Sequence, residues 1–285
     1  MTKITSLPTI AGALLACGLS AAPAAALANR TFVSGKGTDG GTCTRAVPCQ
    51  TFAFALTQTN AGGEIDVLDP GGYGAVTITK AISIVNDGVG TVGIKVSSGN
   101  AITINAGAND SVHLRGLTIE GLGSGANGIQ FNTGGNLAIE NCVIRDFTNA
   151  GINIRPTGSA VVTGVLSKVI TSNNFNGIVV DSTATTGGSL NFTVVDSVAS
   201  NNNNLGIVAL SPAATVMVRN SVASYNKFGL DAESNAVLRV AHSVVTGNTT
   251  GVDAFIGGTI NSYGDNDIDG NTNNNTGVLT PLAMH

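Results

Sequence analysis

The sequence has little charge, few aromatic residues and no tryptophan. Of its 285 residues only 11% are charged and 4% aromatic, while 42% are apolar and the formal net charge is −4. Helical bundles need long stretches rich in Ala, Glu, Lys and Leu, and disordered chains need low hydrophobicity with high net charge, so both classes are disfavoured. The acidic balance argues against nucleic acid as a partner. Glycine, with 38 residues, and asparagine are abundant, which is typical of a β-rich chain with many tight turns.

The first 28 residues have the pattern of a secretory signal peptide. Lys3 supplies a basic start, residues 10–19 form a short apolar core, and Ala26-Leu27-Ala28 has the small-x-small pattern of a cleavage site. The apolar run is too short to span a bilayer. We therefore predict a signal peptide over 1–28 and a mature chain that is secreted, periplasmic or on the cell surface, with no transmembrane segment after cleavage.

Three cysteines remain in the mature chain. Cys43 and Cys49 enclose a five-residue loop, and in an oxidising compartment such a pair is most simply a disulfide. A metal site would need more ligands nearby, and the neighbouring sequence supplies none. Cys142 lies on a turn position of small residues, so we expect it to be a buried small hydrophobic residue.

An internal repeat organises most of the mature chain. In each copy an Asn-rich turn leads to a glycine and then to a short aliphatic strand, as in Gly177-Ile178-Val179-Val180 and Gly206-Ile207. A short repeat of strands without helical periodicity predicts a β-solenoid. Leucine-rich repeats would need a fixed leucine framework, and propeller blades would need about 40 residues per repeat. The repeat-anchoring glycines are Gly128, Gly151, Gly177, Gly206, Gly229, Gly251 and Gly277.

An asparagine stands three residues before most of these glycines. Asparagine tolerates left-handed backbone geometry, and its side-chain amide can bond the coils on either side. A column of stacked asparagines would satisfy buried backbone groups along the solenoid, so we predict a structural ladder rather than a catalytic row. The predicted ladder consists of Asn174, Asn203, Asn226, Asn248 and Asn274.

The repeats, together with the N-terminal segments Arg30–Gly35, Pro48–Phe52 and Pro70–Tyr73, resemble those of the pectin-lyase-like superfamily. The resemblance implies an all-β fold, a right-handed parallel β-helix. It also implies an N-terminal strand and capping segment over 29–74, followed by β-helix coils with a C-terminal cap over 75–285. The apolar face of a short capping helix would come from Phe52, Phe54, Ala55 and Leu56. Because this fold carries many unrelated activities, the resemblance implies little about the reaction.

Strand alternation after each glycine predicts which residues face outward. The first and third residues are apolar and should fill the lumen, while the second and fourth should point to solvent. Arg155 should then lie over Asp181 as a cross-strand ion pair. Asp231, Glu233 and Asp253 should form an acidic cluster on two adjacent coils. These five residues are the candidate face for binding a polysaccharide or a cation. The alternative is that they form a solvated surface that keeps the sheet soluble.

The motifs of known catalytic members are incomplete in this chain. Polygalacturonase-like members carry Asn-Thr-Asp before a Gly-hydrophobic-Asp strand, whereas this chain has Thr250 where the acid would stand. It also lacks their Asp-Asp, Gly-His-Gly and Arg-Ile-Lys motifs. His113 and His242 lie several coils apart and cannot share one site. We therefore assign no catalytic residue, and enzyme status stays open and leans to non-enzyme. An enzyme would be a polysaccharide lyase or a glycoside hydrolase.

Two functions follow from the resemblance and the surface. The first is an exported β-helix protein that binds or processes a polysaccharide, in particular an acidic one. No cofactor is expected, except that Ca²⁺ could bind the acidic cluster. The second is a non-catalytic surface, adhesion or matrix protein, which the Asn/Thr/Ser-rich surface and the low charge fit equally well. A trimeric fibre segment is a third reading, but the sequence shows no heptads, and it does not predict the oligomeric state.

Overall fold

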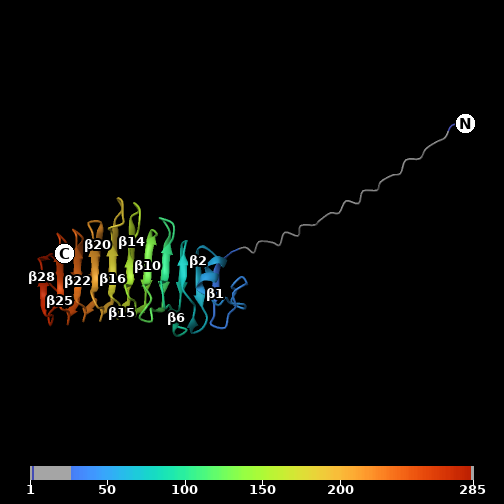
Figure 1. Ribbon diagram of the computed structural model, residues 1–285, viewed down its shortest axis with the longest axis horizontal. Coiled ribbons are helices and arrows are strands. Elements are labelled where there is room, and N and C mark those ends of the chain that lie inside the picture. Colours follow the sequence, from blue (N-terminus) through green and yellow to red (C-terminus); the bar gives the residue numbers. More distant parts are fainter. Residues whose placement is uncertain (1, 3–26, 284–285) are drawn as a thin grey trace.

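The computed structural model describes Thr2 and residues 27–283, so the predicted signal peptide lies almost wholly outside the described residues. Within them the chain winds as a parallel β-solenoid with one short helix (Figure 1), which confirms the predicted fold class. The first strand, β1, begins at Ala28, the residue before the predicted cleavage point. Successive coils contribute strands to three parallel sheets, here named A, B and C.

Sheet A has eleven strands and sheet B has nine. In sheet A they are β1 (Ala28–Val33), β2 (Thr59–Val67), β5 (Ile82–Val85), β8 (Ser111–Arg115), β11 (Asn136–Glu140), β14 (Val162–Ser167), β17 (Leu190–Val195), β20 (Ala214–Arg219), β23 (Val237–Ala241), β26 (Thr259–Ser262) and β29 (Leu279–Pro281). In sheet B they are β3 (Gly71–Gly72), β6 (Val92–Lys95), β9 (Leu117–Glu120), β12 (Val143–Arg145), β15 (Ile170–Ser172), β18 (Val198–Ser200), β21 (Val222–Ser224), β24 (Val244–Thr246) and β27 (Asp267–Ile268).

Sheet C also has nine strands. They are β4 (Val76–Ile78), β7 (Asn100–Asn105), β10 (Asn127–Thr133), β13 (Ala150–Ile154), β16 (Asn176–Asp181), β19 (Leu205–Leu210), β22 (Phe228–Glu233), β25 (Thr250–Phe255) and β28 (Asn273–Thr276). The two longest connections between strands of the coils, residues 155–161 and 182–189, both run from sheet C to sheet A.

The lumen is filled by the aliphatic residues that alternation predicted. Ile152, Ile178 and Ile207 occupy one register position on consecutive strands of sheet C and are at most 1% exposed. The anchoring glycines pack against the next coil too closely for a side chain. A Cβ at Gly206 would lie 2.4 Å from the carbonyl oxygen of Gly229, so this column requires glycine.

A short helix covers the N-terminal end of the lumen. Helix α1 (Phe52–Gln58) begins after Thr51, whose hydroxyl accepts a hydrogen bond from the Phe54 amide at 3.1 Å. Three of the four predicted apolar residues, Phe52, Ala55 and Leu56, are buried, while Phe54 is only partly so. Just before the helix, Cys43 and Cys49 are joined by a disulfide and are both buried. Cys142 is a buried free thiol, and burial raises its pKa to about 12.

An asparagine ladder runs through the turns from sheet B to sheet C, but two of its members differ from the predicted ones. Asn202 and Asn271 stand in the ladder where Asn203 and Asn274 were expected. Asn203 is exposed. The turn over 201–204 has one more residue than the corresponding turns of the neighbouring coils, so the asparagine of the ladder lies four residues before the glycine there and not three. Asn274 follows Asn271 in the same coil, and its Oδ1 accepts from the main-chain and side-chain amides of Asn271 at 3.2 Å each, so it ends the ladder with the same pair of hydrogen bonds. The ladder consists of Asn174, Asn202, Asn226, Asn248 and Asn271.

The glycine pattern also predicted the wrong register for the last coil. β28 pairs with β25 so that Thr250 lies opposite Asn273 and Val252 opposite Asn275. Asn274 therefore holds the position of Gly251, and Gly277 is not a member of the glycine column. The lumen-facing position of this coil carries a polar residue, Asn275, which is exposed. The C-terminal end of sheet C thus closes on asparagines rather than on aliphatic side chains.

Candidate functional site on sheet C

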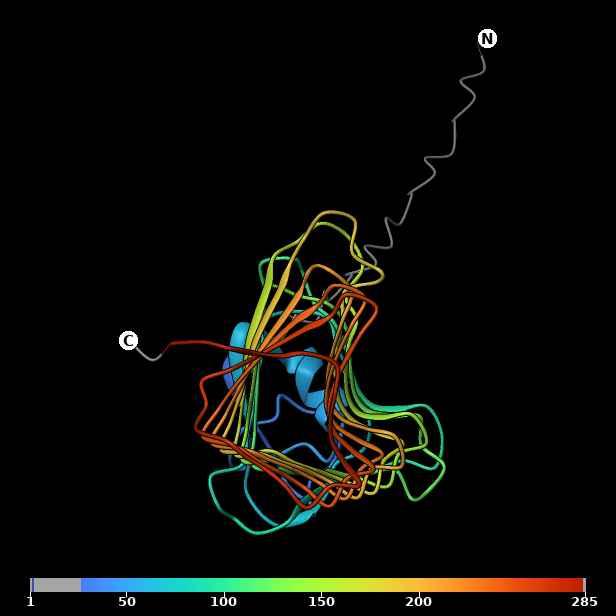
Figure 2. The same ribbon diagram turned by 90° about the vertical axis from the view of Figure 1, so that its left-hand side faces the viewer.

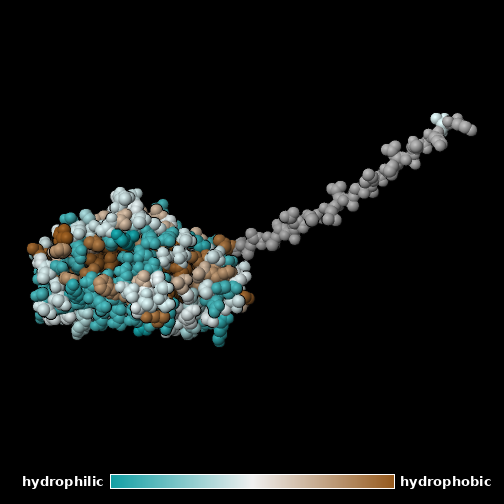
Figure 3. Space-filling model, in the orientation of Figure 1, coloured by the Kyte–Doolittle hydropathy of each residue, from teal (hydrophilic) through white to brown (hydrophobic). Residues whose placement is uncertain are grey.

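The outer face of sheet C lies between the two sets of projecting connections. Viewed along the solenoid axis, the loops from sheet C to sheet A extend on one side of this sheet and the turns from sheet B to sheet C extend on the other (Figure 2). With strands spaced about 4.8 Å apart, nine strands give this face a length of about 40 Å. Figure 3 shows the face with hydrophilic residues in its middle and hydrophobic residues toward both ends. A linear ligand could therefore lie along the sheet.

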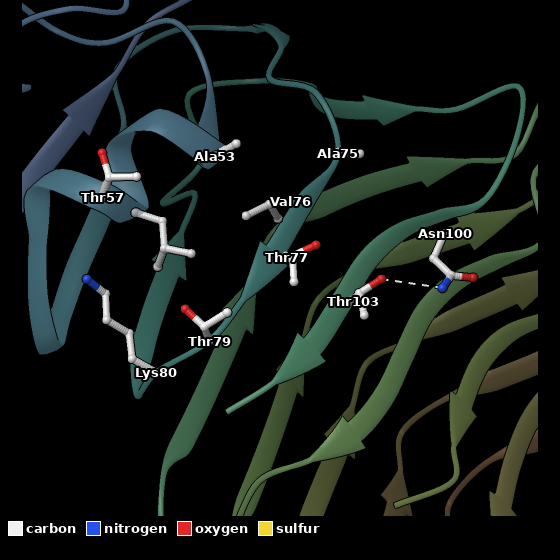
Figure 4. Close-up of a pocket in the computed structure, with 10 residues that line it drawn as sticks. Ala53, Thr57, Ala75, Val76, Thr77, Thr79, Lys80, Asn100 and Thr103 are labelled. Carbon is white, nitrogen blue, oxygen red and sulfur yellow. Dashed lines mark hydrogen bonds between the residues drawn. The ribbon is translucent and has the colours of Figure 1, made fainter. Parts of the chain in front are cut away.

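A pocket of about 420 Å³ opens where helix α1 meets the first strands of sheet C (Figure 4). Leu56 and Thr57 of the helix form one wall, and Thr77 and Thr103 of the sheet form another. Lys80 enters the pocket, and its ammonium donates to the main-chain oxygen of Thr59. Burial lowers the pKa of this ammonium. The pocket offers hydroxyl groups and one cation beside an apolar wall.

Beyond the pocket, side-chain amides form a hydrogen-bonded lattice on the face. Gln130 is its centre, because its Oε1 accepts from Asn153 at 2.8 Å and from Asn127 at 3.2 Å, while its Nε2 donates to Asn132 at 2.8 Å. Asn127 also donates to Asn100 at 2.9 Å, which carries the lattice to the edge of the pocket. These contacts fix the orientation of each amide, so donors and acceptors are presented in a preset pattern.

The candidate residues of the sequence analysis share this face, but they lie in two separate groups. Arg155 lies opposite Asp181 on the next strand, and its Nε is 3.0 Å from the Asp181 carboxylate, as the register predicted. This pair adjoins the amide lattice. The other three candidates, Asp231, Glu233 and Asp253, lie further along, on β22 and β25. Between the groups the outward residues are aliphatic, among them Val208, which is only 1% exposed although it faces outward.

Asp231 is the most perturbed residue of the acidic cluster. It lies between Val208 and Asp253 in the outward row and is 2% exposed, and its Oδ1 has no hydrogen-bond partner among residues 27–283. Burial, and to a smaller extent the nearby charges of Glu233 and Asp253, raise the pKa of Asp231 to about 8. Asp253 itself accepts a 2.6 Å hydrogen bond from the Thr276 hydroxyl. At neutral pH the Asp231 carboxyl therefore holds its proton.

This perturbed carboxyl should make the stability depend on pH. Because the pKa of Asp231 is higher in the folded protein than in the unfolded chain, the folded state binds the additional proton, and stability should fall as the pH rises from about 4 to about 8. The Asp231→Asn variant should lose this slope and be more stable than the parent at pH 8. Chemical denaturation at pH 5, 6.5 and 8 measures the effect, which can reach about 1.4 kcal/mol per pH unit.

The Asp253→Asn variant provides a graded comparison for this prediction. It removes one of the charges that raise the pKa of Asp231 but leaves the burial unchanged, so its slope should lie between those of the parent and of Asp231→Asn. Identical pH slopes in all three proteins would show that Asp231 ionises normally in the folded state.

The acidic cluster does not have the geometry of a metal centre. Within residues 27–283 no group of three or more His, Cys, Asp or Glu side chains is placed to hold a metal ion. The described residues therefore supply no set of three such ligands for the Ca²⁺ that the sequence suggested at this cluster. The histidines lie elsewhere, since His113 on β8 is 3.5 Å from Glu140 and His242 is 3.2 Å from Asp265, both outside sheet C.

The amide lattice and the pocket were not predicted from the sequence. The outward positions of Gln130, Asn132 and Asn153 follow from alternation after the glycine, but their mutual hydrogen bonds depend on the register between coils. Asn127 lies before its glycine and yet faces outward, because its Nδ2 bonds the outward Gln130. The period-two pattern alone does not place such a residue.

Comparisons with known proteins agree with this fold. No family model matches the sequence, and no curated protein matches it either. Among solved structures, the crystal structure of pectate lyase Pel9A aligns with a TM-score of 0.59 and 17% identity, over 86% of this chain and 72% of that one. A rhamnogalacturonan lyase aligns with a TM-score of 0.37 and 12% identity, over 81% and 75%. The first of these confirms the parallel β-helix fold predicted from the repeats. In the described residues no helix is long and apolar enough to cross a membrane.

Proposed function

We propose that this is an exported β-helix protein that binds a polysaccharide along the outer face of sheet C. The observation that carries the proposal is the continuity of polar groups on that face, from the pocket beside α1 through the amide lattice to the Arg155–Asp181 pair. Sugar hydroxyls both donate and accept hydrogen bonds, as side-chain amides do, and a preset amide pattern reduces the entropy lost on binding.

The similarity to pectate lyase Pel9A supports a polysaccharide as the ligand class, and the signal-like N-terminus supports export. Chain cleavage is not part of the proposal. Asp231 supplies a carboxyl that holds its proton at neutral pH, but the face has no histidine or unpaired arginine in the described residues that would complete an acid–base set.

Removing the centre of the amide lattice should weaken this binding. The Gln130→Ala variant deletes the group that holds Asn127, Asn132 and Asn153 in place, so we expect about a tenfold loss of affinity, equivalent to about 1.4 kcal/mol, without loss of the fold. Affinity electrophoresis in gels containing individual polysaccharides measures the change, and absorbance at 235 nm reports any unsaturated lyase product.

The matched control is Asn191→Ala. Asn191 is an exposed amide on β17, on the outer face of sheet A, where it donates to the Ser189 hydroxyl. This variant should bind as the parent does. If no polysaccharide retards the parent protein, the proposal fails, and the non-catalytic surface or matrix protein becomes the better interpretation.

A further inference from the structure

We infer that the ligand of the sheet C face is an uncharged polysaccharide rather than an acidic one. This inference rests on the proposed function and adds the chemical class of the polymer to it. Three observations support it. The basic groups near this face are bound within the protein and are outnumbered by acidic ones, the amide lattice is uncharged, and an apolar platform lies next to the acidic cluster.

The basic groups near this face are already engaged within the protein. Three basic residues lie on sheet C strands or within two residues of them in sequence: Lys80, Arg155 and Lys227. Arg155 is paired with a carboxylate, and the Lys80 ammonium donates to a main-chain oxygen. The Lys227 ammonium lies 5.2 Å from the centroid of the Phe228 ring. A polymer carboxylate would have to compete with each of these contacts.

The acidic groups outnumber the basic ones on the same face. Four carboxyl groups, those of Asp181, Asp231, Glu233 and Asp253, belong to β16, β22 and β25. Only Asp181 has a basic partner, which is Arg155. Glu233 and Asp253 therefore give the part of the face over β22 and β25 a negative potential, although Asp231 holds its proton, and a polymer carboxylate brought there is repelled. A polyanion would be held there only if a cation bridged it to these carboxyls.

An apolar platform lies next to the acidic cluster on the same face, on β19, β22 and β25. Phe228 precedes the anchoring glycine of β22, and Leu210 lies opposite Glu233, which in turn lies opposite Phe255. The Phe255 ring is 55% exposed, while Leu210 and Phe228 are partly exposed. Ring faces of uncharged sugars carry C–H groups that pack on such surfaces, and the hydroxyls at their edges suit the amides. One uncharged chain can therefore satisfy both parts of the face.

The test compares polymers and salt concentrations on the same purified protein. Neutral xylan, β-glucan and galactomannan are compared with polygalacturonate and alginate, each in EDTA and in Ca²⁺, by isothermal titration calorimetry at 50 and 500 mM NaCl. We expect at least one neutral polymer to bind at least tenfold more tightly than either polyanion. Its affinity should change less than twofold between the two salt concentrations, since screening acts only on charge–charge attraction.

Two variants locate the binding on the face. Phe255→Ala removes the most exposed ring of the platform and should weaken the neutral polymer about tenfold. Tyr225→Ala removes an aromatic ring that is 66% exposed but lies in a turn from sheet B to sheet C, and it should have no effect. Equal effects of the two variants would contradict the platform.

The outcomes separate this inference from the proposed function. Tighter binding of a polyanion, whether in EDTA or only with Ca²⁺, would overturn the uncharged ligand while leaving the sheet C face as a polysaccharide site. Absence of binding to every polymer would overturn both. Salt-insensitive binding of a neutral polymer that is weakened by Phe255→Ala is the result that supports the inference.

Discussion

Replacing Ile152 with aspartate should abolish the folded state or destabilise it by more than about 4 kcal/mol. Ile152 is fully buried and lies between Ile129 and Ile178 on the neighbouring strands of sheet C. A carboxylate at this position would have aliphatic side chains above and below it and no partner for its charge. Circular dichroism and denaturant titration of the purified variant would measure the loss.

The control for this variant is the next residue of the same strand. Asn153 faces outward, so Asn153→Asp adds the same chemical group on the solvent side and should cost at most about 1 kcal/mol, through the hydrogen bond that it donates to Gln130. Similar losses in the two variants would mean that the inward and outward rows of this strand are wrongly assigned.

The second large effect is expected in the asparagine ladder. Asn226 accepts from the main-chain and side-chain amides of Asn202, each at 3.0 Å, and donates to the carbonyl oxygen of Ala199 at 3.0 Å. In Asn226→Ala these buried groups lose their partners together, and each unsatisfied group costs about 1–3 kcal/mol. We therefore expect a loss of about 3 kcal/mol or more in denaturant unfolding.

The control for Asn226→Ala is Asn203→Ala, which removes an asparagine that is not part of the ladder. Asn203 was predicted as a member from its distance to Gly206, but it is exposed and its side chain makes no hydrogen bond to the rest of the described chain. Its removal should change the stability by no more than about 0.5 kcal/mol. If Asn203→Ala were as damaging as Asn226→Ala, the ladder would pass through Asn203, as the sequence spacing suggested.

The ladder also shows which spacings in this sequence are structurally reliable. Four of the five ladder asparagines come two residues after the last paired position of a sheet B strand, as Asn174 follows Ser172 and Asn202 follows Ser200, while Asn271 comes three residues after Ile268. The distance from the asparagine to the glycine varies, because the loop between them can accept an additional residue. Counting from a strand end therefore predicts a ladder that counting from the glycine does not.

The fold was predictable because the repeat imposes it many times, whereas the site depends on single neighbours. The acidic cluster and the Arg155–Asp181 pair followed from strand alternation and coil stacking. The burial of Asp231 did not, because it depends on the neighbouring coil, where the buried Val208 lies opposite Asp231. The pocket at Lys80 depends on where α1 lies over sheet C, which no local pattern specifies.

The uniform stacking of sheet C fixes the length of its outer face at a whole number of strand spacings. Consecutive coils such as those that contain β19 and β22 pair residue for residue, with Leu205 opposite Phe228 and Leu210 opposite Glu233. A duplicated coil inserted between them would find matching neighbours on both sides and would lengthen the face by about 4.8 Å. Gain or loss of a coil would therefore change the length of the sheet C face in whole steps and leave the remaining surface unchanged.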